Sequence, residues 1–143
     1  MKNLTIILLF LLAASANASG NDLSARQAER LSEARHILAE VDPRSEEAIA
    51  RELLTTPYPE ENLQIYEAVA RTYLDLVTRK EIVDPQAKTQ LFNKIRLNVA
   101  FLQFGGSPAS GTGKKMDVWI RQTLVRHIPA ELLGSPALFH SLQ

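Results

Sequence analysis

The segment that decides the fold is EENLQIYEAVARTYLDLVTRK, residues 60–80. At 100° per residue, its apolar side chains cover about half of a helical circumference, and no alternation of period two is present. The opposite side is polar and places Glu67, Arg71 and Asp75 at the i,i+4 spacing that supports a helix. We therefore expect a long helix that touches several neighbours. Its apolar face consists of Leu63, Ile65, Tyr66, Val69, Ala70, Tyr73, Leu74, Leu76 and Val77.

Helical spacing of apolar residues continues on both sides of this segment. Two of the flanking helices are expected to begin at Asp-Pro, where Asp caps the helix and Pro takes the first helical position. Gly105-Gly106 is a typical helix end and opens a loop over 105–113. The sequence predicts an all-α, single-domain bundle of five to six helices without a sheet, with the helices over 60–80 and 85–104 at its centre. The other predicted helices cover 24–41, 43–54 and 117–128, and a last short turn extends through Leu142.

Residues 1–18 have the three-part layout of a secretory signal peptide. After a short cationic start, residues 4–14 are almost all apolar, and two overlapping Ala-x-Ala sites end at Ala16 and Ala18. The apolar run would cover only about half of a ~30 Å hydrocarbon core, which disfavours a membrane anchor. We expect cleavage after Ala18, or else Ala16, and export of residues 19–143 as one domain to the periplasm or the medium. No later apolar run approaches ~20 residues, so we expect no stable membrane insertion after cleavage.

The composition narrows the classes of function. The 143 residues include no cysteine, and 16 basic residues balance 16 acidic ones. The lack of cysteine excludes a disulfide scaffold, a thiolate zinc site and a cysteine nucleophile. A net charge near zero argues against a protein that coats nucleic acid. The three histidines lack metal-ligand spacing and the loop over 105–113 lacks the phosphate-binding motif, so we expect no metal, no cofactor and no catalytic residue.

The last long predicted helix presents an aromatic side chain beside a cation. Its apolar arc faces inward, which places Trp119 on the outer side with Thr123 and Arg126. Trp and Arg dominate interface energetics, so this pair is typical of an interface anchor. The alternative, which we favour, is that the C-terminal tail folds back over Trp119, because large aromatic side chains are usually buried. Arg121 interrupts the inward arc, and we expect it to reach solvent or to pair with a carboxylate.

A second apolar stripe contains Leu97, Phe101 and Phe104. We expect this stripe to pack in the core against the following helix. The alternative is an apolar ligand cleft whose mouth would involve the loop over 105–113.

The balanced net charge conceals two blocks of opposite sign. Residues 19–70 carry 5 basic and 11 acidic side chains, a charge of −6, whereas residues 71–143 carry 10 basic and 5 acidic side chains, a charge of +5. We expect the acidic block to dock on the basic block within the molecule. The alternative is that the protein presents two faces of opposite sign to partners. A charged partner would then bind the basic block, to which Lys114 and Lys115 belong.

These features predict an exported, non-enzymatic interaction protein, such as a periplasmic adaptor, an inhibitor or a secreted effector, whose partner is another protein and not nucleic acid. One alternative is a carrier that holds a small apolar molecule between the helices over 85–104 and 117–128. An enzyme of unfamiliar type would require His127, Arg121 and a carboxylate to meet in one cleft. The candidate partner or ligand surface comprises Trp119, Arg126, Thr123, Phe101, Phe104, Lys114 and Lys115.

Overall fold

The computed structural model describes residues 25–42, 44, 46–108 and 113–135, and every regular element in them is a helix. The predicted all-α bundle without a sheet is therefore confirmed for this part of the chain. The predicted signal peptide and the last turn through Leu142 lie outside the described residues. None of the described helices is both long and apolar enough to cross a membrane. The elements are α2 (Ala25–Leu38), α3 (Glu46–Thr55), α4 (Pro59–Arg79), α5 (Pro85–Gln103), α6 (Lys115–His127) and a 3-10 turn, η1 (Ala130–Leu132).

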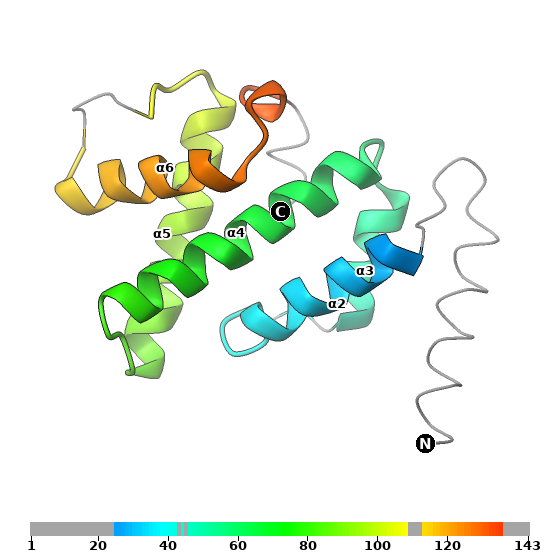
Figure 1. Ribbon diagram of the computed structural model, residues 1–143, viewed down its shortest axis with the longest axis horizontal. Coiled ribbons are helices and arrows are strands. Elements are labelled where there is room, and N and C mark those ends of the chain that lie inside the picture. The colour runs from blue at the N-terminus through cyan, green and yellow to red at the C-terminus, as the bar shows by residue number, and fades with distance from the viewer. Residues whose placement is uncertain (1–24, 43, 45, 109–112, 136–143) are drawn as a thin grey trace.

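α4 is the central element, as its wide apolar face predicts. It packs against α2, α3, α5 and α6, and it runs through the middle of the bundle in Figure 1. We expected α5 to lie at the centre of the bundle beside α4. It lies at the side instead, because it packs mainly on α4 and α6. One side of α5 faces solvent, because Gln86, Gln90, Asn93 and Leu97 on that side are exposed. Only α4 therefore has neighbours on most of its circumference.

The ends of α5 follow the local sequence. The carboxylate of Asp84 accepts a hydrogen bond from the backbone N–H of Ala87 at 2.9 Å, and Pro85 takes the first helical position. This is the predicted Asp-Pro start, in which the missing N–H of proline costs nothing. At the other end, Gly105 adopts a positive φ of 83°, which a residue with a Cβ rarely adopts. The chain therefore leaves the helix here, as the glycine pair predicts.

The predicted start of α3 at Asp42-Pro43 is wrong, because α3 begins at Glu46. The carboxylate of Asp42 instead accepts hydrogen bonds from the backbone N–H of Arg44 at 3.0 Å and from its guanidinium at 2.8 and 3.1 Å. Hydrogen bonds from a guanidinium are charge-assisted and stronger than those from a backbone N–H. Burial alone would raise the pKa of Asp42, but these bonds outweigh it and hold the pKa below the usual range.

Candidate interaction surface

The outer face of α6 carries a stripe of polar and aromatic side chains. At 100° per residue, Lys115, Trp119, Gln122 and Arg126 fall within an arc of about 60°. Lys115, Gln122 and Arg126 are exposed, whereas Trp119 is half-buried and packs against the core. No acidic residue lies on this stripe. We call these four residues the α6 stripe.

Trp119 also contacts two cations from the end of α4. The guanidinium carbon of Arg79 lies 5.6 Å from the centroid of the Trp119 ring, and the Nζ atom of Lys80 lies 4.4 Å from it. Both distances are in the range of cation–π attraction. Neither cation forms an ion pair with a carboxylate among the described residues. The α6 stripe and these two cations therefore form one continuous surface, which we call the cationic face.

The prediction that the C-terminal tail covers Trp119 is tested only in part. Residues 136–143 lie outside the described residues, whereas Leu132 of η1 is buried and Leu133 is exposed. The side chains of Arg79 and Lys80 lie against the ring of Trp119. Sequence reasoning missed both of them, because their position at the end of a helix is already explained by the helix dipole.

The seam between α6 and α4 places Thr123 in the interior and not on the cationic face. Thr123 is fully buried, and its hydroxyl donates to the backbone carbonyl of Trp119 at 2.9 Å. One turn further along α6, Nε2 of His127 lies 2.8 Å from Oδ2 of Asp75 on α4. The hydrogen bond of Thr123 lies within α6, whereas the contact between His127 and Asp75 joins α6 to α4. Thr123 therefore supports the surface from below and is not exposed to a partner.

Arg121 lies on another side of α6 and faces α5. Its side chain does not reach solvent, because the residue is only 3% exposed. The Nη1 atom donates to Oδ1 of Asn98 at 2.9 Å, and the guanidinium lies 4.3 Å from the centroid of the Phe101 ring. Asn98 also donates to the carboxylate of Asp117 at 3.3 Å. Since His127 faces α4, the enzyme hypothesis that joined His127 and Arg121 in one cleft finds no support in this arrangement.

The prediction that the stripe of Leu97, Phe101 and Phe104 packs in the core is wrong for two of its members. Leu97 is 72% exposed and Phe104 is 77% exposed. The physical reason is that α5 turns its other apolar stripe inward, which leaves these two side chains on its outer surface. Phe101 alone is partly buried, and its ring lies between Arg121 and Gly106. A Cβ added at Gly106 would lie 2.1 Å from this ring.

Lys114 and Lys115 are exposed at the start of α6, and Lys114 is its N-cap residue. The predicted candidate residues are therefore distributed over two helices. Lys115, Trp119 and Arg126 share the α6 stripe, and Lys114 lies at its end. Phe101 and Phe104 belong to α5 and are not part of the stripe.

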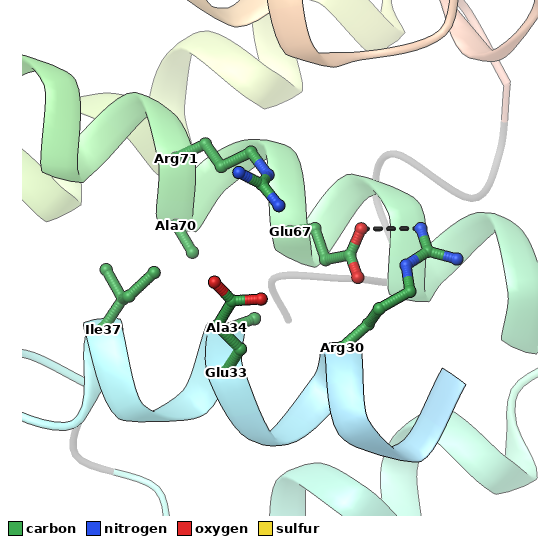
Figure 2. Close-up of a pocket in the computed structure, with 7 residues that line it drawn as sticks. All are labelled: Arg30, Glu33, Ala34, Ile37, Glu67, Ala70 and Arg71. Atoms are coloured by element: carbon green, nitrogen blue, oxygen red, sulfur yellow. Dashed lines mark hydrogen bonds and ion pairs between the residues drawn. The ribbon is translucent and has the colours of Figure 1, made fainter. Parts of the chain in front are cut away.

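A second surface feature is the groove between α2 and α4 shown in Figure 2. Nη2 of Arg30 lies 2.6 Å from Oε2 of Glu67 across the groove, and Glu33 and Arg71 point toward the same opening. Ala34 and Ala70 also line the groove, and the space inside it is large enough for about one water molecule. Its charges are of both signs and balance each other. This groove is a polar contact between helices and too small for a ligand.

The acidic and basic blocks meet at α5, as expected for docking within the molecule. Nζ of Lys88 on α5 lies 2.9 Å from Oε2 of Glu40, and the charge of Arg96 on the same helix helps to lower the pKa of Asp42. The cationic face belongs to the basic block but takes no part in these contacts. The described residues also contain no group of three potential metal ligands.

No protein family model, no curated protein and no solved structure matches this chain. The fold and the surface by themselves define the class of protein, which is a small helical bundle whose last long helix carries a cationic face built around one tryptophan.

Proposed function

We propose that this chain is an exported, non-enzymatic protein-interaction module that binds another protein through the cationic face. The observation that carries this proposal is the position of Trp119. Its ring is half-buried against the core, so it is held in place, and two cations from a different helix lie against it. Anchors of this kind, in which a fixed aromatic ring and Arg side chains share a patch, are the residues that dominate binding energy at protein interfaces.

The test compares capture of partners by the protein and by two variants. Trp119→Ala removes the anchor, whereas Leu97→Ala removes an exposed apolar side chain on α5, outside the cationic face. We expect the protein and Leu97→Ala to retain the same saturable partner from periplasm or culture medium, and Trp119→Ala to lose it. Retention of that partner by Trp119→Ala, in a variant shown to be folded by circular dichroism, would refute the assignment of this face.

Export is a separate part of the proposal and rests on the layout of residues 1–18. Expression of the full chain in a bacterium, followed by intact-mass measurement of the exported fraction, tests it directly. We expect a product that begins at Ser19, or at Asn17 if the earlier site is used. A product that keeps residues 1–18 and stays in the cytoplasm would contradict this part alone.

The carrier alternative receives less support from the contacts between α5 and α6. The space where an apolar molecule would lie is crossed by the hydrogen bond between Arg121 and Asn98. A buried guanidinium is a poor wall for an apolar ligand, because its charge needs polar partners. A thermal-shift screen with fatty acids and small aromatic compounds tests this alternative, and a clear stabilisation would revive it.

A further inference from the structure

The positions of the cations and of the aromatic ring on the cationic face indicate the chemistry of its partner. Lys115 and Arg126 lie eleven residues apart at the two ends of the α6 stripe, a separation of about 16 Å along a helix. Trp119 and Gln122 lie between them. Arg79 and Lys80 add two further cations beside the tryptophan. The face therefore carries positive charge at both ends and next to an aromatic centre.

The cations of this face differ from those that hold the bundle together. Arg30 is neutralised by Glu67, and Lys88 is neutralised by Glu40. On the cationic face, no carboxylate among the described residues pairs with Arg79, Lys80, Lys115 or Arg126. Like charges gathered on one face repel each other, and this repulsion decreases when an acidic surface docks.

We propose that the partner presents a carboxylate-rich segment of polypeptide to the cationic face, with an uncharged side chain against Trp119. The inference rests on the proposed function and deepens it by naming the partner's chemistry. The guanidinium of Arg79 or Arg126 can donate two hydrogen bonds to one carboxylate, while Lys80 and Lys115 act as point charges around it.

The composition of the α6 stripe favours an acidic polypeptide over an anionic membrane. A helix that lies in a membrane interface buries an exposed apolar face below its cations. The α6 stripe has no exposed Leu, Ile or Phe, and its one aromatic ring is already half-buried. Among the described residues, the exposed large apolar side chains also lie outside this stripe: Leu74 on α4, Val83 after α4, Leu97 on α5, Phe104 at its end and Leu133 after η1.

The chain carries its own reporter, because Trp119 is its only tryptophan. We would titrate the protein with poly-L-glutamate and record Trp119 fluorescence, with poly-L-lysine as the probe of opposite charge. We expect saturable binding of poly-L-glutamate that weakens at least tenfold between 50 and 300 mM NaCl, about the range in which surface charges become screened. Poly-L-lysine should give no change. Failure of poly-L-glutamate to bind would overturn the inference.

Paired variants separate this face from the rest of the surface. The variant R79Q/K80Q removes two cations next to Trp119, whereas R26Q/R51Q removes two exposed cations from α2 and α3. We expect R79Q/K80Q to bind poly-L-glutamate at least tenfold more weakly than the unmodified protein does. The affinity of R26Q/R51Q should stay within twofold of that of the unmodified protein. Equal losses in the two variants would mean that only net charge matters, and would overturn the assignment.

Two further arms distinguish the sources of failure. Vesicles of phosphatidylglycerol, with phosphatidylcholine as control, test the membrane, and tighter binding to the anionic vesicles than to poly-L-glutamate would overturn the inference. If poly-L-glutamate fails while the Trp119-dependent partner is still captured, the proposed function stands and only its acidic partner chemistry is wrong. If both fail, the proposed function falls as well.

Discussion

The buried contact between Asn98 and Arg121 makes the sharpest prediction about stability. Asn98 is 4% exposed, donates to the backbone carbonyl of Lys94 at 2.8 Å and accepts from Arg121 at 2.9 Å. A neutral hydrogen bond contributes about 1 kcal/mol, and one to a charged group about 1.5–3 kcal/mol. Asn98→Ala should therefore lower the free energy of unfolding by about 3 kcal/mol. The larger part arises because the guanidinium stays buried after losing an acceptor.

Urea denaturation followed by circular dichroism measures this loss, with Asn93→Ala as the matched control on the exposed side of α5. We expect the control to change the free energy of unfolding by no more than about 0.5 kcal/mol. The double variant Asn98→Leu with Arg121→Met should recover most of the loss, since it replaces both polar partners with apolar groups of similar size. A loss below about 1 kcal/mol in Asn98→Ala would refute the reasoning, because it would mean that the contact contributes no more than an exposed hydrogen bond.

Three other changes test separate parts of the structure. Gly106→Ala places a Cβ 2.1 Å from the ring of Phe101, so we expect a loss of about 1–3 kcal/mol in urea denaturation. The pKa of Asp42 is lowered in the folded state, so its contribution is complete above the unfolded value of about 3.9 and is lost as pH falls through the folded value. The stability difference between the protein and Asp42→Asn should therefore be constant near neutral pH and shrink in titrations below about pH 4. Leu97→Gln should leave the stability within about 0.5 kcal/mol, and a large loss there would show that this side chain is covered.

The architecture was predictable because it follows from local patterns. The apolar face of residues 60–80 is wide enough to need neighbours on several sides, and α4 has them. The start of α5 was predictable because Asp84 and Pro85 act on their own helix and need no distant partner. The start of α3 was not, since Asp42 is held by the guanidinium of Arg44, and a competing side chain is invisible to a capping rule.

The candidate surface was predictable only where one helix determines it. The spacing within α6 placed Trp119 with Arg126 on the outer side. The same spacing placed Thr123 there too, although it is fully buried, because periodicity gives the direction of a side chain and not the position of the neighbouring helix. Leu97 and Phe104 were assigned to the core for the same reason, since an apolar stripe does not say whether a partner helix reaches it.

Arg79 and Lys80 at the end of α4 each have two roles. A cation in the last turn of a helix is favourable because of the helix dipole, and this accounts for the presence of Arg79 and Lys80 in the sequence. The dipole acts equally on any cation near the helix end and does not select where the side chain lies. The ring of Trp119 supplies that selection, because both cations lie over it. Two residues that stabilise their own helix thereby lie beside the surface of another helix, and this is how a chain of zero net charge gathers four cations on one face.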